Sequence, residues 1–242
     1  MSKSHITKIA LFCSLLAALV LLTWLYSNSK SHQAFGKAVP RVDITEHVVA
    51  LTFDDGPTWR VAALLDVLRS RDTKATFFVV GTALEKHPAL ARRIVIEGHE
   101  LGNHSYSHQR MTFKSRTFIA EEIERTDRLI RDAGYAGDIQ FRPPYGKKLL
   151  MLPYYLADQG RASIMWDIAP DSDATLAKDA DKIAAAVLAR VRPGSIVLLH
   201  PMYEAGKPSV AAVVKIIDGL RQQGYEFVTV SDLLQRAQLA NT

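Results

Sequence analysis

The chain begins with one long hydrophobic stretch, before any alternation of polar and apolar positions. Residues 9–26 are almost wholly apolar, and these 18 residues are just long enough to span a bilayer as a helix. Lys3 and Lys8 precede the stretch, and Trp24 and Tyr26 lie at its far end. Because lysines favour the cytoplasmic side and aromatic residues favour the membrane interface, the pattern predicts a membrane span with a cytoplasmic N-terminus.

Two interpretations of this segment compete: a cleaved signal peptide and an uncleaved signal-anchor. The apolar region of a signal peptide is usually about 7–15 residues long and is followed by a small-x-small cleavage site. The candidate site Ser27-Asn28-Ser29 is a weak match. We therefore expect residues 1–26 to be a cytoplasmic stub and a transmembrane signal-anchor. With either interpretation the rest of the chain lies outside the cytoplasm, and a cleaved protein would be secreted.

The residues after the span divide into a polar segment and an alternating one. Residues 27–45 show no apolar period and are expected to form a linker, which leaves residues 46–242 as the globular domain. In that domain, short apolar runs alternate with segments of helical spacing about seven times, which predicts the α/β class, with a parallel sheet and outer helices. The periodicity does not decide whether the sheet closes into a barrel. Strands are predicted at 47–53, 75–81, 99–103, 139–142, 162–166, 195–200 and 225–230, and helices near 61–68, 88–97, 119–130, 149–159, 176–191 and 210–220.

Composition and charge narrow the classes of partner. The chain has 242 residues, 48% of them hydrophobic and 23% charged, which suits one globular domain with a sizeable core. Its formal net charge of +5 is compatible with a nucleic acid, an anionic lipid or an acidic polymer. The basic residues are scattered and no nucleic-acid motif is present, so we expect no nucleic-acid partner. Cys13 is the one cysteine and lies in the apolar stretch, which excludes an intrachain disulfide and a thiolate metal site.

Two adjacent carboxylates follow the first predicted strand. The apolar run 47–53 ends in Asp54 and Asp55, followed by a Gly-Pro turn. Like charges buried together raise at least one pKa or require a cation. A metal ion would resolve this conflict, because one carboxylate could bind it while the other stays free as a base.

Histidines follow two other predicted strands. His104 and His108 are four residues apart, so on one helical turn both imidazoles would face the same metal. With one carboxylate they form a His₂-Asp set, whose open fourth position is typical of catalytic zinc, although cobalt, iron or manganese also suit it. His200 ends the strand 195–200. The alternatives are two surface histidines near a loop and a hydrogen-bonded core histidine, but all three lie on the strand-end rim where parallel α/β folds build active sites.

Two prolines separate Arg142 from Tyr145. Because prolines fix φ and donate no hydrogen bond, the next free N–H, at Tyr145, is expected to be held rigidly and to suit an oxyanion donor. A plain proline turn is the alternative. Asp167 follows the strand 162–166 on the same rim.

Four of these motifs resemble, in order, those of the polysaccharide deacetylases, the NodB-homology family or carbohydrate esterase family 4. The resemblance covers about residues 46–235, and each motif alone is modest, whereas four in the right order are specific. The motifs are Phe53-Asp54-Asp55-Gly56, His104-Ser105-x-x-His108, Arg142-Pro143-Pro144-Tyr145 and Leu198-Leu199-His200.

The resemblance implies a distorted (β/α)₇ barrel and a role for each motif. Asp55, His104 and His108 would bind a divalent metal, usually zinc. Asp54 would be the general base and His200 the general acid. Tyr145 would offer its backbone N–H to the oxyanion.

The family also pairs the arginine of its third motif with an aspartate of a fourth. The fourth motif departs here from its usual Asp-Trp ending, so the partner of Arg142 is expected to be Asp171, with Asp167 and Asp173 as alternatives. Pro201 follows His200, where family members often carry an acid.

The expected activity is metal-dependent removal of N-acetyl groups from N-acetylhexosamine units of an extracytoplasmic polysaccharide or oligosaccharide. Two alternatives stay open. One is a non-catalytic glycan-binding protein on the same fold, against which the complete acid, base and ligand set argues. The other is an O-deacetylase, or a deformylase of a lipid-linked sugar, since those reactions need the same catalytic parts.

Overall fold

The first predicted strand is the centre of the fold. In the computed structural model, which describes residues 3–240, it is β2 (Val48–Gly56), whose apolar residues are buried on both faces. It pairs in parallel with β3 (Thr76–Val79), β6 (Ile196–Leu199) and β7 (Glu226–Val228), and β3 pairs in parallel with β4 (Glu100–Asn103). The predicted α/β class with a parallel sheet is therefore confirmed.

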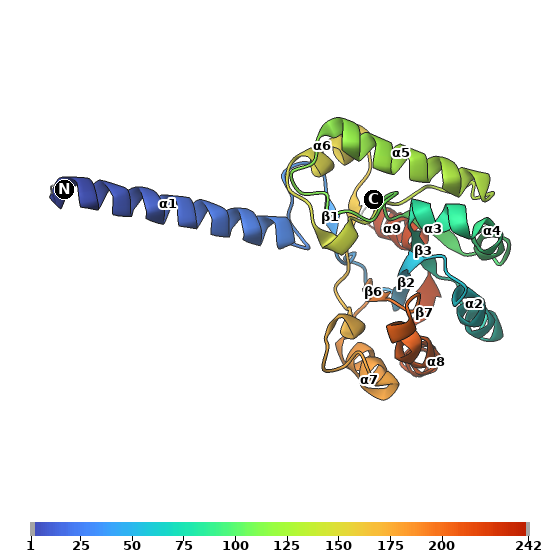
Figure 1. Ribbon diagram of the computed structural model, residues 1–242. Helices are drawn as coiled ribbons and strands as arrows, with labels where there is room; N and C mark the ends of the chain where they lie inside the picture. Colours follow the sequence, from blue (N-terminus) through green and yellow to red (C-terminus); the bar gives the residue numbers. More distant parts are fainter. Residues whose placement is uncertain (1–2, 241–242) are drawn as a thin grey trace.

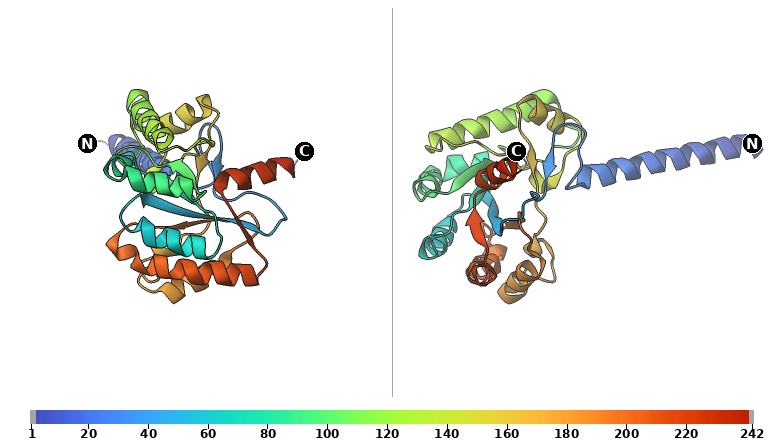
Figure 2. Two further views of the ribbon diagram at one scale, coloured as in Figure 1. Left: turned by 90° about the vertical axis from the view of Figure 1, so that its right-hand side faces the viewer. Right: turned by 180° about the vertical axis from the view of Figure 1, so that it is seen from behind.

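Helices cover the sheet from outside, as the helical spacing predicted. Figures 1 and 2 show them on both sides of the central strand. Their buried apolar faces pack against the strands in a core that continues from α2 through α4, α7 and α8. The helices between the first and last core strands are α2 (Val61–Ser70), α3 (Gly81–Lys86), α4 (Pro88–Ile96), α5 (Arg116–Asp132), α6 (Met151–Asp158), α7 (Ala180–Arg190) and α8 (Lys207–Gln222).

Closure of the sheet into a seven-stranded barrel stays a prediction. The described ladders form a five-stranded sheet and a separate parallel pair, β1 (Ala38–Val39) with β5 (Ser163–Ile164). The predicted strand 139–142 is wrong as a strand. Its Phe141 makes only isolated bridges, to Asn103 and Ser163, because the segment is too short and irregular for a ladder.

The last predicted strand also ends earlier than expected. It was predicted to reach Val230, but a further helix, α9 (Val230–Leu239), begins there. The Thr229 side chain caps this helix by accepting a hydrogen bond from the Asp232 N–H at 3.2 Å. Val230 and Leu233 then pack with strand residues such as Val48 and Ile196, in a second cluster of buried apolar residues.

The N-terminal apolar stretch is one long helix, α1 (Lys3–Asn28), that projects from the domain (Figure 1). Its segment Leu11–Asn28 has a mean hydropathy of 1.8 and is the one described helix long and apolar enough to cross a membrane. A signal sequence passes the same test, so membrane anchoring stays a prediction.

The segment that follows α1 contacts the domain from its first residues onward. Lys148 donates from Nζ to the Ser29 carbonyl, and Lys30 lies 4.8 Å from the ring centroid of Trp166. Residues 38–44, within the expected linker, include β1 and the buried Val42 and Ile44. Residues before the proposed boundary at residue 46 are therefore packed against the domain. The organisation into span, linker and domain stays a prediction.

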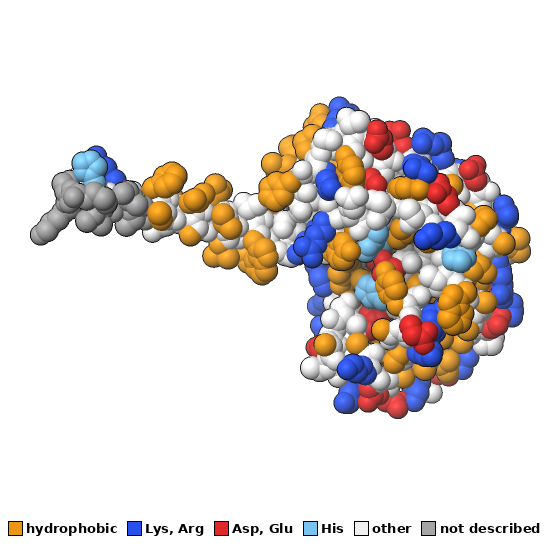
Figure 3. All heavy atoms as spheres, in the orientation of Figure 1, with side chains coloured by type: hydrophobic (Ala, Val, Ile, Leu, Met, Phe, Trp, Pro, Cys, Tyr) orange, Lys and Arg blue, Asp and Glu red, His pale blue; other side chains and the backbone are white. Residues whose placement is uncertain are grey.

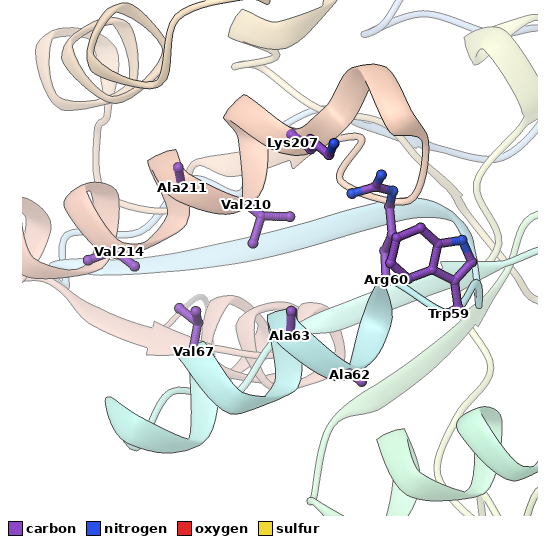
Figure 4. A pocket seen from close by; sticks show the side chains of 9 residues that line it. All are labelled: Trp59, Arg60, Ala62, Ala63, Val67, Lys207, Val210, Ala211 and Val214. Atoms are coloured by element: carbon purple, nitrogen blue, oxygen red, sulfur yellow. The ribbon is translucent and has the colours of Figure 1, made fainter.

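A groove of about 530 Å³ runs between α2 and α8 (Figure 4). Its floor consists of small apolar side chains, and Trp59 stands at one end, 68% exposed, with the Arg60 guanidinium 4.4 Å from its ring centroid. No histidine, aspartate or glutamate lines it. The predicted titratable residues lie instead at the carboxyl ends of the strands. The residues that line the groove are Trp59, Arg60, Ala62, Ala63, Val67, Lys207, Val210, Ala211 and Val214.

Candidate active site

Both acidic residues of β2 lie at a break in the strand pairing. The register between β2 and β3 shifts between Asp54 and Gly56, and Asp55 has a left-handed φ of 70°. Aspartate is among the few non-glycine residues that tolerate this conformation. Because the break interrupts the alternation of side chains, both carboxylates approach one imidazole: Asp54 Oδ2 lies 3.5 Å and Asp55 Oδ1 3.6 Å from His104 Nε2.

Asp55, His104 and His108 form a donor set that fits a metal ion. Their ligand atoms all lie within 4.8 Å of one another, and Asp55 Oδ1 is 3.1 Å from His108 Nε2. His104 Nδ1 lies 2.8 Å from the Arg142 carbonyl oxygen, so the proton belongs on Nδ1 and Nε2 presents its lone pair. Asp55 Oδ1 is buried and accepts no hydrogen bond. A buried acceptor facing an imidazole lone pair is unfavourable unless a cation lies between them.

The charge states of Asp55 and His104 agree with metal ligation. Burial opposes the charge of Asp55, but the close contact with His108 and the charge of His200 help to hold the pKa of the carboxyl at about 2. Burial lowers the pKa of His104, which keeps its imidazole neutral. A carboxylate and neutral imidazoles are the forms that bind a divalent ion.

The helical turn predicted for His104 and His108 is wrong. Residues 104–108 form a loop in which Ser105 and His108 have left-handed φ values of 65° and 57°. The Glu122 carboxylate on α5 stabilises this loop by accepting hydrogen bonds from the N–H groups of residues 106 and 107, at 3.0 and 2.8 Å. The loop still brings the two imidazoles together, with ring centroids 4.9 Å apart. Spacing alone gave no signal for Glu122.

Arg142 pairs with Asp54, so the expected Arg142–Asp171 pair is wrong. Its side chain is completely buried, and one guanidinium nitrogen donates to Asp54 Oδ1 at 2.7 Å and to Thr52 Oγ1 at 2.8 Å. Its other nitrogens donate to the carbonyl groups of residues 164 and 165. A buried guanidinium needs all of these acceptors, and together they hold Asp54 with its second oxygen toward His104.

Neither of the alternative aspartates reaches Arg142. Asp167 accepts hydrogen bonds from the Ser195 hydroxyl at 2.8 Å and from the Ile196 N–H at 3.0 Å. Asp173 accepts from the N–H and hydroxyl of Thr175, within its own turn.

Asp171 instead orients His200. One carboxylate oxygen accepts the His200 N–H at 2.6 Å, and the other lies 3.1 Å from its Nδ1. The Ser209 hydroxyl donates to the same carboxylate at 2.8 Å. Burial alone would lower the pKa of His200, but the hydrogen bond and charge of Asp171 raise it to about 9. Asp171 therefore provides a carboxylate beside His200, although position 201 is a proline here. Because Asp171 contacts Nδ1, Nε2 of His200 is the nitrogen available for proton transfer.

We expect Asp171→Asn to shift the alkaline limb of the pH profile of kcat/KM to lower pH. The amide keeps the shape but removes the charge, so the pKa of His200 should fall from about 9 toward its ordinary 6.5 and a general acid would lose its proton earlier. The same pair should stabilise the fold fully below pH 6.5 and lose that contribution as the pH rises toward 9. Rate profiles of metal-loaded wild type, Asp171→Asn and the exposed control Asp173→Asn would check this. Coinciding alkaline limbs would contradict it.

Tyr145 lies at the edge of the site in a left-handed conformation, with φ 57°. Its ring is 54% exposed and lies against His108, with centroids 4.6 Å apart. The following two N–H groups bond back to the proline carbonyls, whereas that of Tyr145 has no hydrogen-bond partner within residues 3–240. A fixed N–H without a partner beside His108 is the arrangement that an oxyanion donor requires.

Tyr203 is a rim residue that the sequence did not single out. It is 51% exposed, and burial together with the Asp55 and Asp54 carboxylates raises the pKa of its hydroxyl. Figure 3 shows histidine and acidic side chains gathered in a hollow near the centre of one face of the domain. Exposed tyrosine side chains, Tyr145 and Tyr203, thus accompany the buried charged residues.

Several known proteins are similar to this chain in sequence and in fold. The polysaccharide deacetylase family model matches residues 41–162. A peptidoglycan-N-acetylglucosamine deacetylase of Bacillus cereus is 37% identical over 190 residues, which are 77% of this chain and 68% of the relative. The peptidoglycan-N-acetylglucosamine deacetylase PgdA of Listeria monocytogenes is 34% identical over 191 residues, or 78% of this chain but only 39% of the relative.

A solved structure gives the same result in three dimensions. The Bc1960 peptidoglycan N-acetylglucosamine deacetylase superposes with a TM-score of 0.74 at 34% identity, over 80% of this chain and 90% of the other. The segment matched by the family model, residues 41–162, contains Asp54, Asp55, His104 and His108.

Proposed function

The chain belongs to the polysaccharide deacetylase family, and from this premise we propose that it is a metal-dependent hydrolase of carbon–nitrogen bonds that removes N-acetyl groups from N-acetylhexosamine units of an extracytoplasmic glycan. The observation that carries the proposal is the Asp55–His104–His108 donor set beside a second carboxylate, Asp54, that pairs with Arg142. A non-catalytic glycan-binding protein would have no need of an unligated acid and an oriented histidine at that place.

Each side chain has a role in amide hydrolysis. Asp55, His104 and His108 would hold the divalent ion, for which zinc is the first choice and cobalt or manganese are possible. When bound, such an ion polarises a water molecule and the amide carbonyl. Asp54 would take a proton from the water as its oxygen bonds to the carbonyl carbon.

The remaining residues would act on the other atoms of the amide. The Tyr145 N–H would donate a hydrogen bond to the carbonyl oxygen as its negative charge grows. His200, held by Asp171, would then give its proton to the nitrogen as the carbon–nitrogen bond breaks, which leaves acetate and a free amine. Arg142 would act through Asp54, by fixing the position of its carboxylate.

The location is proposed from the N-terminal helix. We propose that residues 9–26 anchor the protein in a bilayer and that the domain, residues 46–242, lies outside the cytoplasm. If the segment is cleaved, the domain is secreted. Its substrate would then be a glycan outside the membrane, as the names of the Bacillus and Listeria relatives suggest for those proteins.

The proposal is tested with the full-length protein in detergent, by measuring the acetate that it releases from glycan substrates. We expect a zinc-loaded preparation to release acetate from N-acetylglucosamine oligomers and from peptidoglycan glycan strands, and a chelated preparation to release none until metal is restored. O-acetylated and N-formylated glycans in the same panel separate N-deacetylation from the alternative hydrolases. Binding of all substrates without release of acetate or formate would contradict the hydrolase and favour a glycan-binding protein.

A further inference from the structure

A second cavity, of about 570 Å³, adjoins the candidate active site. It shares His108 and Tyr145 with that site, so a substrate held at the metal ligands would extend directly into it. The side chains that it adds are polar or positively charged, and no acidic residue lines it. Its lining residues are His108, Gln109, Arg110, Thr112, Lys114 and Tyr145.

The cations of this cavity make no ion pair within the described part of the chain. Arg110 lies over the Tyr145 ring, 5.2 Å from its centroid. The Lys114 Nζ donates to Gln109 Oε1 at 2.8 Å and lies 4.4 Å from the centroid of a phenylalanine ring. Burial, together with the charge of Arg110, lowers the pKa of Lys147, so a third cation lies near the same edge.

These contacts hold the cations in place without neutralising them. Neighbouring like charges destabilise one another, and an anion among them would relieve that repulsion. Figure 3 shows Lys and Arg side chains on both sides of the hollow that contains the histidines. The planar guanidinium of Arg110 suits a carboxylate in particular, because it can donate two parallel hydrogen bonds.

We propose that this cavity is an anion subsite that binds a carboxylate on the sugar next to the N-acetylated one. The inference rests on the proposed function and narrows its substrate to acidic N-acetylated glycans. Peptidoglycan strands from which the stem peptide has been removed, with a free lactyl carboxylate on alternate sugars, and uronate-containing polysaccharides both have this chemistry. A neutral oligomer of N-acetylglucosamine has none and would leave the cations unpaired.

The test compares substrates with and without the charged group. Metal-loaded full chain in detergent is given peptide-free peptidoglycan tetrasaccharides with free lactyl carboxylates, or with the same groups converted to methyl amides. A uronate-containing N-acetylated tetrasaccharide distinguishes the two natural sources. We expect kcat/KM to be about tenfold higher for the charged strand at low salt, because two partly exposed charge contacts contribute about that factor together. The preference should shrink at about 0.5 M salt, where charges are screened.

Variants assign the preference to the cavity. The double variant R110Q/K114Q should bring the ratio of kcat/KM for charged over amidated strands close to one. R128Q/K178Q removes two exposed cations elsewhere, has the same net charge and should keep the wild-type ratio. A wild-type ratio near one, or a ratio that R110Q/K114Q leaves unchanged, would overturn the subsite.

Binding measurements separate this inference from the proposed function. Calorimetry of the same two strands with the wild type and R110Q/K114Q requires no turnover. If the charged strand binds about tenfold tighter and only the wild type distinguishes the two, the subsite stands even when no acetate is released, and the hydrolase proposal alone fails. Equal affinities in the wild type would overturn the subsite and leave the hydrolase intact.

Discussion

A His108→Ala variant is expected to lose its bound metal and its activity together. His108 supplies one of three protein ligands, 3.1 Å from the ligand oxygen of Asp55. Loss of an outer partner of a metal ligand already costs about 10–100-fold in metal affinity, so loss of a direct ligand should cost more than 100-fold. His104→Ala should act the same way, but its imidazole is more deeply buried and its removal leaves a cavity.

Metal content after dialysis and thermal unfolding measure this loss. Zinc should raise the Tm of the wild type, because a ligand that binds only the folded state stabilises it, and should leave the Tm of His108→Ala unchanged. His47→Ala is the matched control, since it removes an exposed histidine whose ring lies 5.2 Å from that of Tyr225, just before the opposite end of β2. A His108→Ala variant that kept stoichiometric zinc and full activity would contradict the assignment of the donor set.

The sequence predicted those residues of the site that lie at the ends of strands. The predicted strands 47–53, 99–103 and 195–200 correspond to β2, β4 and β6, and parallel strands place the residues at their carboxyl ends on one edge. Asp55, His104 and His200 could therefore be grouped before any contact was known. The same reasoning did not require the exact path of the loops between them.

Pairings across the fold could not be predicted in this way. Arg142 reaches Asp54, 88 positions away, and Asp171 reaches His200, 29 positions away. Each contact depends on where an irregular segment lies, and the departure of residues 166–173 from the family pattern removed the motif that would have guided it. Burial decides the outcome: the fully buried guanidinium takes the nearest carboxylate and carbonyl groups.

Two other misses have local causes. The 104–108 loop departs from a helix because its backbone is left-handed at two residues and bonds to Glu122, which a spacing argument does not include. The sequence does contain a helix-start pattern for α9, the cap residues Thr229 and Asp232 before Leu233. The predicted strand 225–230 overlaps this pattern, so the helix start was not recognised.

An Asp54→Asn variant is expected to keep its metal and lose about 10²–10⁴-fold in kcat, the range for loss of a general base. The amide has the shape of the carboxylate but cannot take a proton from water at neutral pH. Asp54 does not belong to the donor set, so zinc content should stay near that of the wild type. Retention of metal distinguishes this variant from His108→Ala, in which both quantities fall.

Because Asp54 forms a buried ion pair with Arg142, this experiment needs a control for stability. Removing one partner of a buried ion pair costs about 3–5 kcal/mol, so the folded fraction of Asp54→Asn must be measured by circular dichroism and used to correct kcat. Thr52→Val removes another hydrogen bond of the same guanidinium and leaves the base in place; it should lower stability with a much smaller loss of kcat. If corrected kcat of Asp54→Asn matched that of Thr52→Val, Asp54 would be a structural partner of Arg142 and the base would have to be another group.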